Sequence, residues 1–109
     1  MLEKPYAFAG GEEKTIEQVI DRDEVMINHM ILPRGAALPQ HNANSNVFMT
    51  VVRGQVTLQL DDQPPHCYEA GQIIEIPFRT LMNVSNQDEA VLELFVIKAP
   101  GPRTMNNPV

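Results

Sequence analysis

Residues 47–60 read VFMTVVRGQVTLQL, and Gly54 divides them into two short runs that are rich in apolar side chains. In the second run, residues 55–60, apolar and polar side chains alternate. Successive side chains of a β-strand point to opposite faces, so this alternation predicts a strand with one buried face. The first run, residues 47–53, is rich in β-branched and apolar residues, which also favours a strand. We therefore predict two consecutive strands that meet at Gly54.

Similar short runs lie on both sides of this pair. Residues 25–32, 73–76 and 91–97 are mostly apolar, and segments containing Gly, Pro, Asn or Asp separate them. Strands that recur about every 8–12 residues between turn residues are typical of β-sandwiches and barrels. Residues 15–21 fit a strand or a short helix, because their isoleucines would share a face in either. We predict a strand there, since the rest of the chain is all-β.

Length and charge restrict the function classes. The chain has 109 residues, which suits one domain with one hydrophobic core. Its formal net charge is −6, from 8 Lys and Arg against 14 Asp and Glu, whereas nucleic-acid and anionic-membrane surfaces need clustered positive charge. A single cysteine excludes an internal disulfide, and the acidic N-terminal residues do not resemble a signal peptide. We expect a cytoplasmic protein without nucleic-acid or membrane partners.

Two stretches, residues 35–54 and 71–86, resemble the paired motifs of the cupin superfamily. In each stretch several motif residues are kept at the family's spacing, and a short two-strand connection lies between the motifs. The retained residues are Gly35, His41 and Gly54 in the first motif and Gly71, Pro77 and Asn86 in the second. The resemblance implies an all-β fold, the double-stranded β-helix or RmlC-like jelly-roll barrel, with the functional site in its mouth.

The resemblance also implies a domain plan. It covers residues 25–98, which we take as the barrel core of one domain spanning residues 1–109. Residues 1–14 are then an N-terminal arm, and residues 99–109 are a C-terminal tail. We expect the tail to be loosely held, because it has no apolar periodicity. Cupins are commonly homodimers, so the resemblance implies a homodimer.

The family's metal ligands are mostly missing. Metal-binding cupins hold their ion with two His and one Glu from the first motif and one His from the second. Those four slots correspond to His41, Ala43, Val47 and Met82 in this chain, so only His41 keeps its imidazole. Divalent transition metals usually need three or more imidazole, carboxylate or thiolate donors. The resemblance therefore implies a degenerate metal site, and we predict no metal and no cofactor.

We expect a small organic ligand in the barrel mouth around His41 and Met82. Alternation from Val47 places Met49 on the inward face, and the family's register would point Asn28 and Met30 inward too. An apolar pocket with a few neutral hydrogen-bonding groups suits a small, largely uncharged ligand. The predicted ligand-binding residues are Asn28, Met30, His41, Met49 and Met82.

Three alternatives remain open. Some cupins, such as sugar-nucleotide epimerases, act without metal through a His base and an acidic partner, and His41 would be the candidate catalytic base here. Glu75 and Glu93 alternate with apolar neighbours and are expected to face solvent, so no acidic partner can be named. A soft Cu(I) site made by His41 with Met82 and Met49 is a weaker alternative. The barrel could also serve mainly in assembly, with its methionines only filling space.

The other histidines and the cysteine do not extend the site. The family's register places His29 on the outer face of its strand, where we expect a subunit contact. His66 and Cys67 are adjacent, so on a strand they would face opposite ways. We expect an edge residue and a small buried thiol, respectively.

Overall fold

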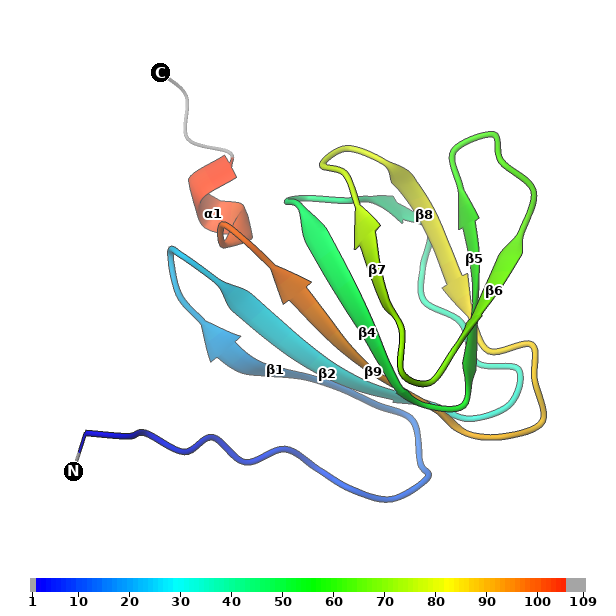
Figure 1. The fold of residues 1–109 in the computed structure, drawn as a ribbon, viewed down its shortest axis with the longest axis horizontal. Helices are drawn as coiled ribbons and strands as arrows, with labels where there is room; N and C mark the ends of the chain where they lie inside the picture. The colour runs from blue at the N-terminus through cyan, green and yellow to red at the C-terminus, as the bar shows by residue number, and fades with distance from the viewer. Residues whose placement is uncertain (1, 106–109) are drawn as a thin grey trace.

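The computed structural model describes residues 2–105. Within them the chain folds as two antiparallel sheets, and Figure 1 shows β5, β6 and β8 on one side of the molecule and β1, β2 and β9 on the other. The strand order is β1-β2-β9-β4-β7 in the five-stranded sheet and β3-β8-β5-β6 in the four-stranded sheet. The elements are β1 (Thr15–Asp21), β2 (Met26–Leu32), β3 (His41–Asn42), β4 (Val47–Arg53), β5 (Gln55–Leu60), β6 (His66–Glu69), β7 (Ile73–Ile76), β8 (Leu81–Ser85), β9 (Leu92–Lys98) and α1 (Pro102–Met105).

The predicted strands are confirmed. β4, β5 and β7 have the predicted bounds, β2 and β9 differ from them by one residue, and the ambiguous segment 15–21 is the strand β1, paired with β2. The inner faces of the two sheets form one hydrophobic core, as the alternation requires. In β4 and β5 the inward residues Val47, Met49, Val51, Val56 and Leu58 are each at most 1% exposed.

Two of the retained motif residues have structural roles. Gly54 has φ +80° at the β4–β5 turn, and a Cβ there would collide with the backbone of Val91. Asn86 is fully buried, and its Nδ2 donates to the carbonyl oxygens of Leu32 at 2.9 Å and Ala90 at 2.8 Å. Its Oδ1 accepts the backbone N–H of Asp88 at 2.9 Å. These two residues therefore fix the chain around the β8–β9 connection.

The C-terminal segment is better ordered than the sequence suggests. Residues 102–105 form α1, and both Gly101 and Pro102 are buried. The Gly101 N–H donates to the carbonyl oxygen of Asp23 at 2.8 Å, which ties the segment to the β1–β2 turn. The expectation of a loosely held tail is wrong for residues 99–105, because these backbone contacts replace the missing apolar periodicity. Residues 106–109 of the predicted tail lie outside the described part of the chain.

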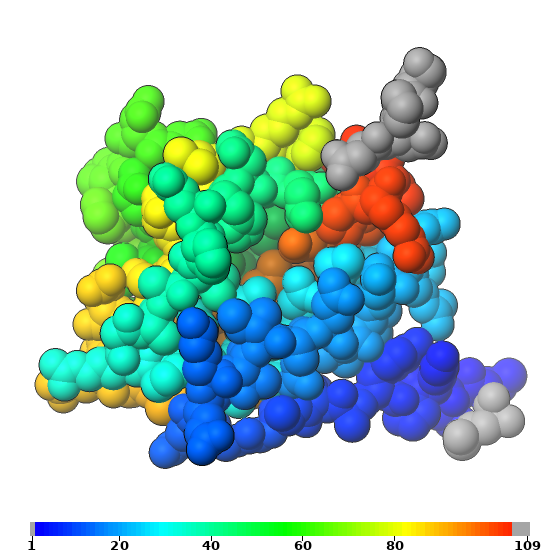
Figure 2. Space-filling model, turned by 180° about the vertical axis from the view of Figure 1, so that it is seen from behind, coloured from blue at the N-terminus to red at the C-terminus, as the bar shows by residue number. Residues whose placement is uncertain are grey.

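The N-terminal arm, residues 2–14, runs as an extended segment past β1 and β2 (Figure 1). Seen from behind, the arm lies along one edge of the molecule (Figure 2). It is attached to the outer face of the five-stranded sheet, where the Ala9 N–H donates to Glu17 Oε2 at 2.9 Å. No helix within residues 2–105 is long and apolar enough to span a membrane.

Candidate ligand site at the barrel mouth

One row of residues crosses the five-stranded sheet. Asn28 of β2 is the Cα partner of Val96 in β9, and Val96 is in turn the partner of Met49 in β4. Directly opposed residues of an antiparallel sheet project from the same face. Because Met49 and Val96 are both core residues, Asn28 points into the space between the sheets. The predicted inward direction of Asn28 and Met49 is therefore confirmed.

The Asn28 side chain has an unusual environment. The residue is 9% exposed, and its Oδ1 is buried without a hydrogen-bond partner among residues 2–105. An unpaired buried acceptor costs about 1–3 kcal/mol, the free energy of removing it from water. An unpaired buried acceptor of this kind calls for an explanation, and one explanation is that a bound molecule donates the missing hydrogen bond.

The three predicted methionines belong to the core. Met30, Met49 and Met82 are 8%, 1% and 3% exposed, and all three belong to the hydrophobic cluster between the sheets. The structure brings them together but leaves them almost no open surface. Methionine side chains are flexible, so they can be displaced at a lower cost than branched side chains.

His41 lies at the edge of the four-stranded sheet. It is the Cα partner of Met82 through the β3–β8 pairing, but its own side chain is exposed. Its Nδ1 lies 2.9 Å from the carbonyl oxygen of Pro39, so Nδ1 carries the proton and donates it to that oxygen. Nε2 is then the free basic nitrogen of the ring.

The donor set at the family's metal position does not fit a divalent metal. Ala43 and Val47 are buried apolar residues, at 2% and 0% exposed, and Met82 is a neutral thioether. Within residues 2–105 no group of three or more His, Cys, Asp or Glu side chains is placed to hold a metal ion. The site thus offers one imidazole and one soft sulfur.

Lys98 is a mouth residue that is not among the residues predicted from the sequence. At the end of β9 it is the Cα partner of Met26 on one side and of Val47 on the other. Val47 is fully buried, so Lys98 shares the inward face of the sheet. Burial lowers the pKa of the Lys98 ammonium. The alternation that turns Leu94 and Val96 inward continues to Lys98 and was the signal that could have found it.

The rim of the mouth is formed by two rows, one from each sheet. The row of the five-stranded sheet is Met26, Lys98, Val47 and Ile76, and the row of the four-stranded sheet is His41, Met82 and Leu60. The β3–β4 and β7–β8 connections both join these rows, so the rows lie at the same end of the barrel. A cavity of about 200 Å³ opens there, lined by Leu60, Asp61, Gln63, Pro77 and Thr80.

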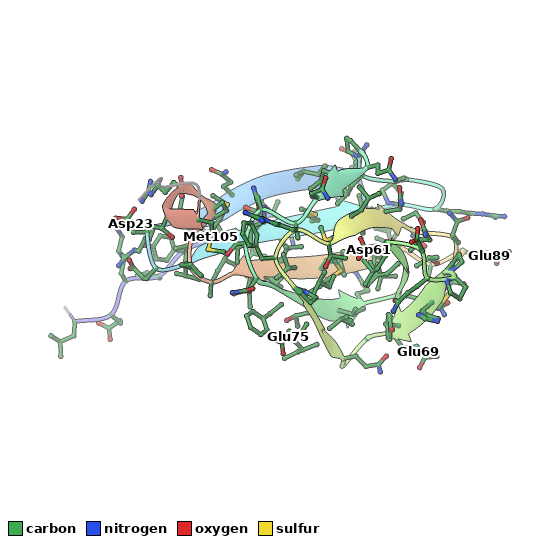
Figure 3. All side chains as sticks on the ribbon, turned by 90° about the horizontal axis from the view of Figure 1, so that it is seen from above. Asp23, Asp61, Glu69, Glu75, Glu89 and Met105 are labelled. Atoms are coloured by element: carbon green, nitrogen blue, oxygen red, sulfur yellow. The ribbon has the colours of Figure 1, made fainter. Side chains whose placement is uncertain are left out.

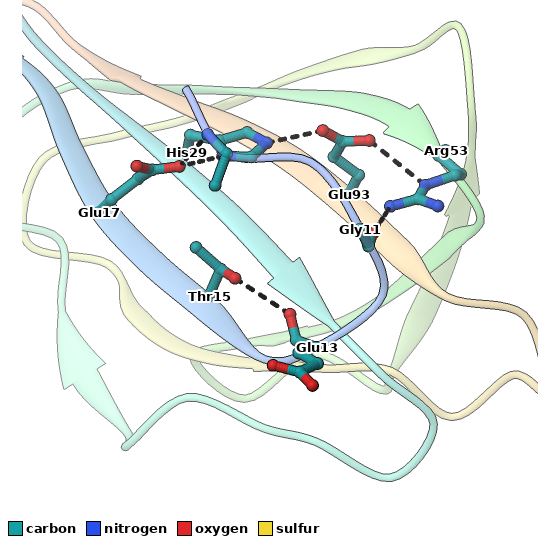
Figure 4. A network of polar contacts seen from close by, with 8 residues as sticks. Gly11, Glu13, Thr15, Glu17, His29, Arg53 and Glu93 are labelled. Carbon is teal, nitrogen blue, oxygen red and sulfur yellow. Dashed lines mark hydrogen bonds and ion pairs between the residues drawn. The ribbon is translucent and has the colours of Figure 1, made fainter. Parts of the chain in front are cut away.

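His29 and Glu93 are placed differently from expectation. His29 is on the outer face, as predicted, and lies between Glu17 and Glu93 (Figure 4). It is, however, fully buried within its own chain. Its Nδ1 lies 2.7 Å from Glu17 and its Nε2 lies 2.6 Å from Glu93. The Phe8 ring of the arm packs 4.8 Å from the imidazole. The Glu93 side chain is only 14% exposed, so the prediction that it faces solvent is wrong, because the arm and His29 cover it.

The remaining sequence candidates lie on the surface. Glu75 is exposed, as predicted, and lies at the periphery of the molecule (Figure 3). His66 and Cys67 are both exposed on β6, the edge strand of the four-stranded sheet. The expectation of a buried thiol is wrong, since an edge strand leaves Cys67 open to solvent. Its Sγ lies 3.5 Å from Thr57 Oγ1 on the neighbouring strand.

A larger cavity, of about 490 Å³, lies on the outer face of the five-stranded sheet. Its lining is almost entirely apolar and includes two side chains of the N-terminal arm. The lining residues are Tyr6, Phe8, Val19, Ile20, Ile27, Thr50, Phe95 and Ile97. It is separated from the barrel mouth by the sheet itself, so it is not part of the candidate ligand site.

Comparison with known proteins defines the family. No family model matches the chain, but the uncharacterized protein MJ0764 of Methanocaldococcus jannaschii is 41% identical over 109 residues, covering 99% of this chain and 94% of that protein. The crystal structure of an RmlC-like cupin family protein with a double-stranded β-helix fold (MJ0764), from the same organism, matches with a TM-score of 0.94, covering 98% of this chain and 99% of that one. A cupin superfamily protein of Desulfitobacterium hafniense matches at 12% identity with a TM-score of 0.72, covering 85% and 83% of the two chains, and shows the fold alone. The chain therefore belongs to the RmlC-like cupins, and its fold is the double-stranded β-helix.

Proposed function

We propose that this cupin binds a small organic ligand in its barrel mouth and does so without a metal ion. The observation that carries the proposal is Asn28, whose buried Oδ1 lacks a donor among residues 2–105 while its side chain points between the sheets. A ligand that donates a hydrogen bond to Oδ1 would remove the cost of that unpaired atom. The methionines beside it would supply an adaptable apolar wall.

The residues of the rim support entry of the ligand into the barrel from the end where His41 lies. His41 and Leu60 are the two Cα partners of Met82, one in each neighbouring strand, and Leu60 lines the cavity of about 200 Å³. A small molecule that enters there meets the Met82 thioether before it reaches the core. Small-molecule sites typically combine such apolar walls with a few placed polar groups.

Metal independence rests on the donor set. One imidazole and one thioether are too few for Mn, Fe, Zn or Ni, and they favour at most a soft ion such as Cu(I). We therefore expect purified protein to contain no stoichiometric transition metal by elemental analysis. Added Zn²⁺, Mn²⁺ and Cu(I) should leave the thermal midpoint unchanged. A clear stabilisation by Cu(I) that is lost in His41→Ala would instead favour the copper alternative.

The binding proposal is tested by nuclear magnetic resonance of the methionine methyl groups. The chain has six methionines, and three of them, Met30, Met49 and Met82, report on the mouth. A screen of small sugars, carboxylates and aromatic compounds should include compounds that shift these methyl signals while leaving that of Met105 on α1 in place. If no compound in the screen moves the three mouth signals, the proposal is wrong.

A second candidate is a metal-free isomerase or epimerase with His41 as the base. The observation in its favour is the Nδ1 contact to Pro39, which fixes the ring and leaves Nε2 free to accept a proton. A catalytic role predicts that His41→Gln abolishes turnover of a bound ligand but not its binding. Binding without any turnover in the wild-type protein would exclude this candidate.

We also propose that the protein works as a homodimer through the outer face of the five-stranded sheet. Phe8, Val52 and Ile73 are 52%, 48% and 67% exposed on or beside that face, next to the apolar cavity of about 490 Å³. Four strands of seven residues and the shorter β7 give a face of at most roughly 19 by 23 Å. That is about half of the roughly 800 Å² per partner of a standard interface, so the arm would supply much of the remaining contact area. Two copies related by a two-fold axis would bury the same face on each.

Light scattering after gel filtration tests the dimer. Ile73→Lys should produce a monomer, because it places a charge in the proposed interface. Ile16→Lys is the matched control, since Ile16 is 54% exposed but lies on the opposite face of the sheet, as the Cα partner of Met30. A wild-type monomer, or dimers of equal stability in both variants, would contradict this interface.

A cytoplasmic location is the last part of the proposal. The exposed free thiol of Cys67 supports it, because reducing compartments keep such thiols unpaired. Fractionation of the source cells tests the location directly, and recovery of the protein in the extracellular fraction would contradict it.

A further inference from the structure

We propose that the ligand is a small carboxylate that also carries a hydrogen-bond donor, with the carboxylate on Lys98 and the donor on Asn28. This inference rests on the proposed function and specifies its ligand class. The compounds that meet the description are hydroxy acids and amino acids, in which a hydroxyl or amino group lies next to the carboxylate. Such a ligand is anionic, whereas the sequence alone favours a largely uncharged one.

The placement of Lys98 is the first step of the argument. Lys98 lies in a row of paired residues on the inward face of the sheet. The other side chains of this row are all apolar and belong to Met26, Val47 and Ile76. Val47 and Ile76 are both fully buried. The ammonium therefore projects from a wall that offers it no hydrogen-bond acceptor from a side chain.

The missing counterion is the second step. None of the ion pairs formed within residues 2–105 includes Lys98, although several other cations of the chain are paired. Burial is also what lowers its pKa, and no neighbouring carboxylate offsets that effect. Partial burial removes part of the hydration of the Lys98 ammonium, and a bound anion would compensate for that loss. A carboxylate on an ammonium also forms a charge-assisted hydrogen bond, which is stronger than a neutral one.

The position of Asn28 relative to Lys98 is the third step. Lys98 is the Cα partner of Met26, and Asn28 lies two residues further along the same strand, on the same face. Such diagonal neighbours have Cα atoms about 7–8 Å apart. The two side chains can therefore reach a single small molecule from two directions. Because Asn28 Oδ1 can only accept, the group that meets it must donate, as a hydroxyl or an amino group does.

The third part of the ligand would face apolar side chains. Val96 lies between Asn28 and Met49 in their shared row, and both Val96 and Met49 belong to the core cluster. The substituent of the acid is therefore expected to be apolar and small, since little open space lies above this row. Lactate is the simplest probe that has all three features.

The experiment compares lactate with two relatives, each of which lacks one feature. Lactamide lacks the charge, and propanoate lacks the hydroxyl. Binding is measured by titration of the Met30 and Met49 methyl signals and of the Asn28 side-chain amide signal. Lactate is expected to bind most tightly, and Lys98→Met should weaken it about ten- to a hundred-fold, as expected for a lost hydrogen bond to a charged group. Lys14→Met, at an exposed lysine of the arm, is the matched control and should leave lactate binding unchanged.

The outcomes separate this inference from the proposed function. If lactamide binds as well as lactate, and Lys98→Met changes neither, the carboxylate inference is wrong while ligand binding in the mouth stands. If propanoate binds as well as lactate, the proposed hydrogen bond from the ligand hydroxyl to Asn28 is wrong. If lactate moves none of these signals but a neutral compound of the wider screen does, the inference also fails alone. If no compound moves them, both proposals fail together.

Discussion

His29 of β2 bridges two carboxylates on the outer face of the five-stranded sheet, with Glu17 of β1 at 2.7 Å and Glu93 of β9 at 2.6 Å. Both ring nitrogens face carboxylate oxygens, which suits an imidazolium that donates to both. Arg53 extends the network, because its Nε lies 3.2 Å from Glu93 and its guanidinium donates to the Gly11 carbonyl oxygen at 2.7 Å (Figure 4). The network therefore joins four strands, β1, β2, β9 and β4, and the N-terminal arm.

Replacement of His29 should destabilise the fold. His29→Leu leaves Glu93 mostly buried with only Arg53 as its partner, and removing one partner from a buried ion pair is strongly unfavourable. We expect a loss of about 2 kcal/mol in the free energy of unfolding, measured by urea denaturation. The exposed His66 is the control, since His66→Leu should change stability by less than about 0.5 kcal/mol. Equal effects of the two substitutions would mean that the network contributes nothing.

The attachment of the arm should depend on pH through Glu17. The Ala9 N–H is the main cause that lowers the pKa of the Glu17 carboxyl, and the hydrogen bond to His29 adds to it, from an ordinary value of 4.5. The ionised form is therefore the one that holds the arm. The stabilisation is fully present above pH 4.5 and is lost as the pH falls below that value through the lower pKa of the folded state.

The amide chemical shift of Ala9 measures this transition. It should change with a midpoint below pH 4.5 as the hydrogen bond to the carboxylate weakens. Glu17→Gln is the matched control, because its amide oxygen still accepts the Ala9 N–H but does not titrate. A variant that shows the same transition as the wild-type protein would rule out Glu17 as its cause.

The strands that the sequence predicts are those with a local pattern. The alternation in β5 and the β-branched run in β4 depend only on neighbouring residues, so their bounds can be read without knowledge of the fold. β3, β6 and β8 are not among the predicted strands. β6 carries His66, Cys67, Tyr68 and Glu69, in which no apolar alternation exists, and it becomes a strand because its backbone pairs with the edge of β5.

The two glycines that resemble the first cupin motif should differ in their tolerance of alanine. Gly35 and Gly54 both have positive φ, at +81° and +80°, but a Cβ meets open space at Gly35 and the Val91 backbone at Gly54. Gly35→Ala should cost only the left-handed backbone strain, about 1–2 kcal/mol. Gly54→Ala should cost about 3 kcal/mol or more, since a steric clash with backbone adds to that strain. Thermal unfolding of the two variants measures the difference, and equal midpoints would contradict it.

The candidate site is predicted only in part. The face of the sheet to which a side chain points follows from its neighbours in sequence, whereas the residues that it contacts depend on the fold. Alternation and the family's register were enough to turn Asn28 and Met49 inward, but the predicted strand ended at residue 97 and so omitted Lys98. The contact of His29 with both Glu17 and Glu93 depends on the register of three strands. Register is set by long-range pairing, which a single sequence does not reveal.

Two buried asparagines should respond in opposite ways to replacement by leucine. Asn86 makes three hydrogen bonds through its carboxamide, so Asn86→Leu should lower the free energy of unfolding by about 2 kcal/mol or more. Asn28 leaves its Oδ1 unpaired, so Asn28→Leu should raise it by about 1 kcal/mol.

The same Asn28→Leu protein should lose binding of lactate, as measured by the Met49 methyl signal. Stability gained together with binding lost is the pattern expected when a residue is kept for function at a cost to the fold. Urea denaturation of Asn28→Leu and Asn86→Leu under identical conditions provides the comparison. If Asn28→Leu destabilises the protein as much as Asn86→Leu does, Asn28 has a structural role in the folded protein, and the principal support for the mouth as a ligand site is removed.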